Sequence, residues 1–220
     1  MVAASDTGVI PLDPDLSEEA ALREGGFRHV AGVDEAGRGA WAGPLVAAAV
    51  ILPPPDAVPD DFLAGVRDSK LCSAELREIL FEAVVDAALA VSIGSVAADE
   101  IDLLGLTAAN ELAMVRAVRA LSPAPDFVLV DCFKLRSLGR PQKGIVQGDR
   151  RCLSIAAASI LAKVYRDAWI AELGRPLAGY GFERHRGYGV VEHRKAIGVH
   201  GVTDLHRLSY APLRALTNGS

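Results

Sequence analysis

Four acidic residues follow apolar segments of the chain, at positions where strands are expected to end. They are Asp34 and Glu35 after HVAGV, Asp131 after FVLV, and Asp149 after IVQG, just before a predicted helix. A carboxylate at the end of a buried strand is costly unless water, a cationic side chain or a metal ion compensates its charge. Because several strand ends can meet at one edge of a sheet, we expect these acids to converge.

Converging carboxylates would repel one another at neutral pH, and two divalent cations would remove that repulsion. Oxygen ligands without nearby His or Cys favour Mg²⁺ or Mn²⁺ over zinc. Two such ions about 3.5–4 Å apart are the usual apparatus for in-line displacement at a phosphodiester. The acids therefore predict a metal-dependent phosphodiester hydrolase.

The structural alternative is that these acids belong to turns or cap helices, and Asp149 is well placed to cap the helix that follows it. Asp34 and Glu35 raise a further difficulty, because adjacent strand residues point to opposite faces of a sheet. Both serve one site only if the strand has already ended or bulges there. The glycines that follow favour such a bend.

Hydrophobic periodicity predicts strands and helices that alternate after an initial hairpin. The predicted strands cover 29–33, 45–52, 91–96, 127–130 and 144–146, and the helices 16–23, 73–86, 102–121, 153–171 and a short piece near 191–197. The first two strands are antiparallel neighbours, because only the Gly-rich segment 36–44 separates them. This pattern predicts an α/β fold with a central mixed sheet and helices on its faces. Residues 1–26 are an N-terminal extension, and residues 27–220 form one domain with a basic helical C-terminal segment.

The formal net charge of −5 conceals a strong asymmetry along the 220 residues. Residues 1–132 hold 8 Lys and Arg against 22 Asp and Glu, whereas residues 133–220 hold 15 against 6. A C-terminal part with a formal charge of +9 suggests a polyanionic partner, although chance clustering on solvated helix faces explains it equally well.

Three cysteines without a CxxC pair fit a reducing compartment. No apolar run is long enough to cross a bilayer and no signal peptide is seen, so we expect a cytoplasmic protein without a membrane partner.

Four blocks in order along the chain resemble the ribonuclease HII family. They are AGVDEAGRGAWAGPLVAAAVIL at 31–52, RDSK at 67–70, GDRRCLSIAAASILAKVYRD at 148–167, and HRGY at 185–188 followed by EHRKAI and HRLSY. The resemblance runs from about Phe27 to Arg214. It implies an RNase H-like fold with a helical C-terminal segment, in agreement with the mixed sheet.

The resemblance also implies an activity and a site. Members of this family hydrolyse the RNA strand of RNA–DNA hybrids and nick duplex DNA on the 5′ side of a single embedded ribonucleotide, leaving 3′-hydroxyl and 5′-phosphate ends. The family's four metal-binding acids match Asp34, Glu35, Asp131 and Asp149, and its cofactor is two Mn²⁺ or Mg²⁺ ions. Its GRG loop matches Gly37, Arg38 and Gly39, and its ribose-sensing tyrosine matches Tyr188.

Basic residues near these motifs are candidates for substrate phosphate contacts: Arg38, Lys70, Lys163, Arg184 and Arg186. Lys163 is the strongest of them, because a charge on an otherwise apolar helix needs a reason. Glycine at 37 and 39 lets backbone groups approach a ribose 2′-hydroxyl closely, although a plain tight turn is the simpler reading. The sequence departs from the family at Cys132, where glycine is common, and at Val190, where threonine is usual.

Two other functions compete with the nuclease. One is a non-catalytic nucleic-acid-binding module that uses the basic segment, and four carboxylates beside DNA would give it no benefit. The other is a nucleotide-binding α/β protein, which lacks the required Gly-rich turn into a helix here. The C-terminal histidines match no zinc-ligand spacing. We expect a monomer that acts on RNA–DNA hybrids and ribonucleotide-containing duplex DNA.

Overall fold

The fold is built on a five-stranded mixed sheet, seen in a computed structural model that describes residues 13–58, 65–66 and 69–217. The strands are β1 (Val30–Ala36), β2 (Leu45–Ile51), β3 (Ala90–Val96), β4 (Phe127–Asp131) and β5 (Gln142–Ile145). They lie in the order β3-β2-β1-β4-β5. The first three are antiparallel neighbours, and β4 and β5 run parallel to β1. The predicted mixed sheet and its opening antiparallel hairpin are confirmed.

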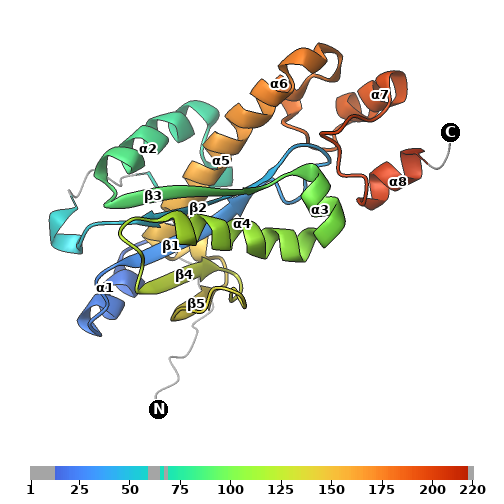
Figure 1. The fold of residues 1–220 in the computed structure, drawn as a ribbon. Helices are drawn as coiled ribbons and strands as arrows, with labels where there is room; N and C mark the ends of the chain where they lie inside the picture. The colour runs from blue at the N-terminus through green and yellow to red at the C-terminus, as the bar shows by residue number, and fades with distance from the viewer. Residues whose placement is uncertain (1–12, 59–64, 67–68, 218–220) are drawn as a thin grey trace.

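Helices cover both faces of this sheet, as Figure 1 shows. On one face lie α3 (Ala98–Leu104) and α4 (Leu106–Ala120), and α4 packs its apolar side on β1, β2 and β3. On the other face lie α2 (Ala74–Ala87) and α5 (Leu153–Leu173), whose alanines allow close approach to the sheet. Because β1 and β2 are buried on both faces, they are apolar along nearly their whole length.

Most predicted helices are confirmed, with one difference. Ser73 caps α2 by accepting a hydrogen bond from the Leu76 N–H at 3.2 Å. The helix predicted over 102–121 is instead two helices, because Gly105 between α3 and α4 takes a φ of +78°, which only glycine adopts without strain. Short 3₁₀ turns complete the connections at Pro55–Ala57, Ser69–Leu71, Gly148–Arg150 and Arg175–Tyr180.

The N-terminal helix α1 (Ser17–Glu24) packs beside the start of β1 and touches α5. The buried Glu19 accepts hydrogen bonds from the backbone and the hydroxyl of Ser154, at 2.9 and 2.5 Å. The three cysteines of the described chain are all free thiols.

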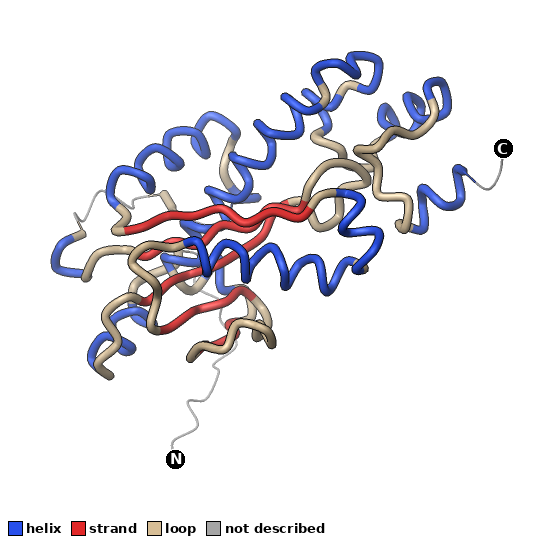
Figure 2. The backbone as a smooth tube through the Cα atoms, in the orientation of Figure 1, coloured by secondary structure: helices blue, strands red, loops and turns tan. Residues whose placement is uncertain are grey.

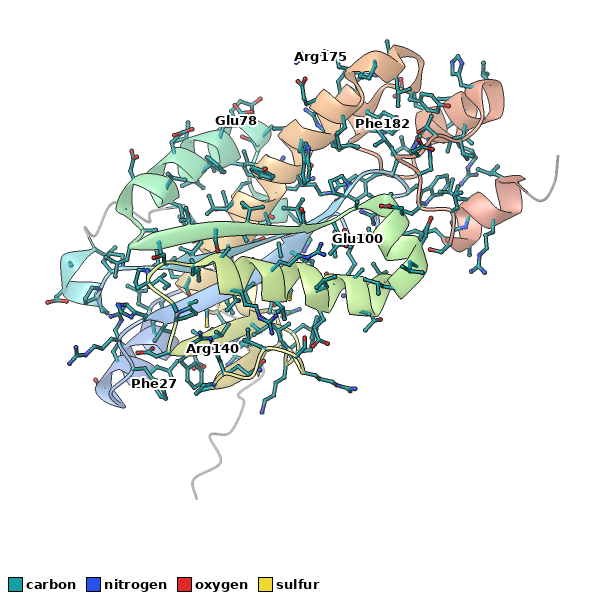
Figure 3. All side chains as sticks on the ribbon, in the orientation of Figure 1. Phe27, Glu78, Glu100, Arg140, Arg175 and Phe182 are labelled. Carbon is teal, nitrogen blue, oxygen red and sulfur yellow. The ribbon has the colours of Figure 1, made fainter. Side chains whose placement is uncertain are left out.

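The C-terminal segment contains α6 (Phe182–His185), α7 (Val191–His200) and α8 (Ala211–Thr217), grouped at one end of the sheet (Figure 1). The loop between β1 and β2 extends into this group in the tube view (Figure 2). A separate apolar cluster joins them, with Trp41 and Ala42 of that loop packed near Phe182, which Figure 3 labels. The β1–β2 loop and the C-terminal segment therefore meet beyond the carboxyl end of β1.

Candidate active site

The strand β1 carries both acids of the DE pair. The sequence predicted a strand that ends before Asp34, but β1 continues to Ala36, and Asp34 and Glu35 keep regular pairing with Ala48 and Ala47 of β2. The strand therefore neither ends nor bulges at the pair, and the expectation that the two acids need such a break to lie near one another is wrong, because both still feel the charge of Asp131 at this end of the sheet. Alternation places Asp34 on the face covered by α5 and Glu35 on the face covered by α4.

Asp34 is a carboxylate crowded by other carboxylates. It is only 6% exposed, and its Oδ1 accepts a hydrogen bond from the Glu35 N–H at 2.7 Å. Burial raises the pKa of Asp34 well above its usual value, and the negative charges of Glu35, Asp131 and Asp149 raise it further. The other three predicted acids therefore all lie within the electrostatic reach of Asp34, at the same end of the sheet.

Glu35 lies where positive and polar groups partly offset its burial. Burial and the charge of Asp131 raise the pKa of Glu35, while Arg38, Asn110 and Lys70 lower it. The Arg38 guanidinium approaches the Glu35 carboxylate at 3.8 Å. Asn110, on α4, is 1% exposed, and neither its amide oxygen nor its nitrogen has a hydrogen-bond partner of ordinary geometry. Sequence reasoning missed Asn110, since one asparagine in a helical pattern gives no distinguishing signal.

Asp131 and Asp149 come from two neighbouring parts of the fold. Asp131 is the last residue of β4, and its Oδ1 accepts a hydrogen bond from the Gly148 N–H at 2.7 Å. Asp149 is buried in the 3₁₀ turn before α5, and Lys70 Nζ lies 4.0 Å from its Oδ2. Cys152 occupies the N-cap position of α5, so Asp149 does not cap this helix.

The donor set fits hard divalent cations in its chemistry. Buried, mutually repelling carboxylates gain most when a cation neutralises them, and carboxylate oxygens suit Mg²⁺ and Mn²⁺. Within the described ranges, no three His, Cys, Asp or Glu side chains are gathered tightly enough to form a ligand group. The charge of Asp34 thus interacts with those of the other three acids, but the described side chains are not gathered into one ligand group.

A groove of about 490 Å³ lies beside these acids. Its lining residues are Glu35, Ala36, Gly37, Arg38, Gly39, Ser69, Lys70, Ser159, Lys163 and Tyr188. It brings together the GRG turn, the tyrosine and two of the predicted lysines. Residues 67 and 68 of the RDSK block lie outside the described residues.

Tyr188 is held in this groove from several sides. Its N–H donates to the His185 carbonyl at 2.9 Å, and its carbonyl accepts a hydrogen bond from His193 Nδ1 at 3.0 Å. Lys163 Nζ lies 5.1 Å from the centre of the Tyr188 ring and also pairs with Asp167 at 2.9 Å. The aromatic ring and one cation of the groove are therefore positioned together.

Two of the predicted phosphate contacts lie outside the groove. Arg184 is paired with Glu183 and Glu192, at 2.6 and 2.7 Å. Arg186 contributes its carbonyl to a hydrogen bond from Arg166, and its side chain does not line the groove. A substrate contact by either arginine stays a prediction.

Comparison with known proteins decides the family. The family model described as ribonuclease HII matches residues 31–213. The chain belongs to the ribonuclease HII family. It is 46% identical over 203 residues to the ribonuclease HII of Dehalococcoides mccartyi, covering 92% of this chain and 95% of that protein. It is 48% identical over 200 residues to the ribonuclease HII of Roseiflexus castenholzii, covering 91% and 89%.

A solved structure agrees with this membership. The crystal structure of the ribonuclease H2 from Pyrococcus horikoshii OT3 superposes with a TM-score of 0.73 at 26% identity, covering 86% of this chain and 97% of that one. As a member of the ribonuclease HII family with this fold, the protein is a hydrolase of the ribonuclease H type and an endonuclease. None of the helices in the described part of the chain is long and apolar enough to span a bilayer.

Proposed function

We propose that this member of the ribonuclease HII family is a metal-dependent endonuclease with two related substrates. It hydrolyses the RNA strand of RNA–DNA hybrids, and it nicks duplex DNA on the 5′ side of a single embedded ribonucleotide, leaving 3′-hydroxyl and 5′-phosphate ends. The observation that carries the proposal is the raised pKa of Asp34, caused by burial and by three other carboxylates, beside a groove that contains the GRG turn and Tyr188. A protein that only bound nucleic acid would gain nothing from this crowding of negative charge.

The four acids would hold two divalent cations, Mg²⁺ or Mn²⁺. When bound, these ions supply activation of a water nucleophile and stabilisation of the leaving 3′ oxygen. Asp34, whose carboxylate feels the charges of the other three acids, would hold the ions together with them. Glu35, Asp131 and Asp149 would complete the binding from β1, β4 and the turn before α5.

The groove residues would bind and orient the nucleic acid. Lys70 and Lys163 carry the positive charge needed to bring a phosphodiester next to the acids. The backbone of Gly39, where an added Cβ would meet nothing within 4 Å, can approach a ribose closely, whereas at Gly37 the space of a Cβ is filled by Arg166. Tyr188 lies across the same groove and can stack on the sugar or bond its 2′-hydroxyl, which distinguishes RNA from DNA.

The remaining properties follow the same proposal. The enzyme acts as a monomer in the cytoplasm, on RNA–DNA hybrids and on duplex DNA that contains ribonucleotides, and takes part in removing those ribonucleotides. The alternative is a binding module that uses the basic C-terminal segment without catalysis. Cleavage by the wild-type protein and its loss in Asp34→Asn would support the nuclease. A binding module would cut the substrate neither before nor after this substitution.

A labelled DNA duplex with one ribonucleotide tests the proposal, with an all-DNA duplex as control. Each is incubated with Mg²⁺, with Mn²⁺ or with a chelator. We expect a nick on the 5′ side of the ribonucleotide that requires the metal and is absent from the control. If folded protein binds the duplex but cuts it with neither metal, the binding module is correct and the nuclease proposal is wrong.

A further inference from the structure

Two arginine side chains are completely buried next to the groove without lining it. Arg166 on α5 and Arg207 before α8 are both 0% exposed. Arg166 approaches the carboxylate of Asp167 at 3.7 Å, too far for a hydrogen bond. Burial lowers the pKa of Arg166 to about 10 and lowers that of Arg207. Burying a guanidinium has a large desolvation cost unless specific partners compensate, so both residues need a reason to be there.

Arg166 connects two segments that are far apart in the sequence. Its Nε and Nη2 donate to the carbonyls of Pro44 and Ala42, in the β1–β2 loop, at 3.0 and 3.1 Å. Its Nη1 donates to the carbonyl of Arg186, two residues before Tyr188, at 3.1 Å. A single rigid guanidinium therefore fixes the β1–β2 loop against the segment that carries the tyrosine.

The same side chain touches the two features that would sense the ribose. The guanidinium carbon lies 5.3 Å from the centre of the Tyr188 ring. A Cβ added at Gly37 would lie 1.8 Å from Arg166 Nε, so the turn rests directly on the arginine. The Arg166 side chain thus contacts both the Gly37 backbone and the Tyr188 ring.

Arg207 holds the turn from a second direction. Its Nη1 donates to the Gly37 carbonyl at 2.7 Å and its Nε to the Gly43 carbonyl at 3.0 Å. The Tyr210 hydroxyl donates to the carbonyl of Arg38 at 2.7 Å. With Arg207 fixing the turn, Arg166 adds a side-chain link between the turn and Tyr188. It acts beside the backbone hydrogen bonds that the Trp41 and Ala42 N–H groups donate to the Gly187 carbonyl, at 2.8 and 3.2 Å.

We propose that Arg166 is a positioning residue for ribonucleotide selectivity, acting through Tyr188 from a buried site outside the groove. This inference rests on the proposed function, in which the turn and Tyr188 sense the 2′-hydroxyl. Arg166 supports the ring by a cation–π contact and fixes its distance from the turn through three carbonyl hydrogen bonds. Loss of this geometry reduces discrimination between ribose and deoxyribose more than it reduces binding of duplex in general.

The test measures binding in an Asp34→Asn background, where cleavage is removed. Dissociation constants are measured for a duplex with one ribonucleotide and for the all-DNA duplex, and their ratio is the selectivity. Arg166→Lys keeps the charge but loses the planar fork. We expect it to lower the selectivity roughly tenfold, since small misplacements at a recognition site have effects of this size or larger. We expect Arg166→Lys to change the affinity for the all-DNA duplex much less than the affinity for the duplex with one ribonucleotide.

The matched control is Arg23→Lys. Arg23 also donates to backbone carbonyls, those of Arg28 and Leu52 at 2.9 and 2.7 Å, but it lies on α1, away from the groove. We expect Arg23→Lys to leave the selectivity at the parent value. An equal loss in both variants would mean that any disturbed arginine lowers selectivity, and would overturn the proposal.

A double mutant separates positioning from general structural support. In a Tyr188→Ala background, Arg166→Lys should cause little further loss of selectivity, because the residue through which it acts is already gone. Losses that multiply would show independent effects and overturn the proposal. If Arg166→Lys fails to fold, Arg166→Gln replaces it, and failure of both while Arg23→Lys folds would assign Arg166 a structural role alone. A parent protein without selectivity would instead contradict the proposed function.

Discussion

At the scale of single residues, the four acids proposed to form the active site oppose the stability of the metal-free protein. The pKa of Asp34 is raised in the folded state, mainly by burial and then by Glu35, Asp131 and Asp149. The folded protein therefore binds the Asp34 proton more tightly than the unfolded chain, where the pKa is about 3.9. The stability that this proton contributes is complete below the unfolded pKa and is lost as the pH rises through the raised folded pKa.

Asp34→Asn should accordingly stabilise the metal-free protein while it abolishes cleavage. The amide keeps the shape of the side chain and removes the buried charge, so we expect a gain on the order of 1 kcal/mol or more near pH 8. Thermal unfolding in chelator at pH 4 and pH 8 measures this, and the gain should shrink toward pH 4. Excess Mn²⁺ should reduce the difference in stability between Asp34→Asn and the wild-type protein, because it stabilises the wild-type protein. A variant less stable than wild type at pH 8 would contradict the electrostatic account.

Asn110 offers a second test at this scale, because its amide favours the ionised form of Glu35. Asn110→Ala should raise the pKa of Glu35 further, since the remaining burial and the charge of Asp131 both favour the protonated form. We expect activity to fall by about tenfold at low pH, where more Glu35 is protonated, and by less at high pH. The pH–rate profile checks this, with Met114→Leu, one turn along the same buried face of α4, as control. An equal loss at every pH would indicate a packing defect instead.

At the scale of elements, the position of the DE pair depends on the contact between β1 and α5. A Cβ at Gly32 would lie 2.3 Å from the backbone carbonyl carbon of Ser154 and 2.4 Å from the Ile155 nitrogen. Glycine at this point therefore lets the helix lie directly on the strand. Any displacement of α5 would also move Lys163 and Arg166 relative to the acids.

Gly32→Ala should be strongly destabilising, because backbone on both sides of the contact must separate. We expect a loss of about 3 kcal/mol in the free energy of unfolding, at the upper end for an overpacked core. Urea unfolding measures it as a lower midpoint. The control is Gly198→Ala inside α7, where nothing lies within 4 Å of the added Cβ, and it should gain about 0.5–1 kcal/mol. Similar effects at both positions would mean that the Gly32 contact is not the cause.

The elements themselves were largely predictable, because apolar strands and amphipathic helices are local patterns. The convergence of the acids was predictable in part, since β4 ends at Asp131 as expected, whereas β1 continues past Asp34 and Glu35 to Ala36. The break at Gly105 was not, because an isolated glycine in a helical pattern is compatible with a continuous helix. The roles of Arg166 and Asn110 were hidden for a different reason: their partners are distant in sequence and become visible only when the sheet and helices are assembled.

At the scale of the whole molecule, the chain must bring a polyanion to a cluster of carboxylates. The N-terminal part carries most of the negative charge, and the segment after residue 132 has an excess of Lys and Arg. The groove meets this demand locally, because Lys70 and Lys163 line it beside Glu35. Substrate binding should therefore depend on salt through a small number of groove cations rather than on net charge.

Lys163→Ala should reduce the salt dependence of substrate binding, whereas the same loss of charge elsewhere should not. In an Asp34→Asn background, we expect the slope of log binding constant against log salt to become shallower by about 1. The control is Arg140→Ala, labelled in Figure 3, which precedes β5 and so lies at the edge of the sheet opposite the carboxyl end of β1. Both variants have the same net charge, so equal slopes would show that overall charge attracts the nucleic acid. A change confined to Lys163→Ala would assign that attraction to the groove that Lys163 lines.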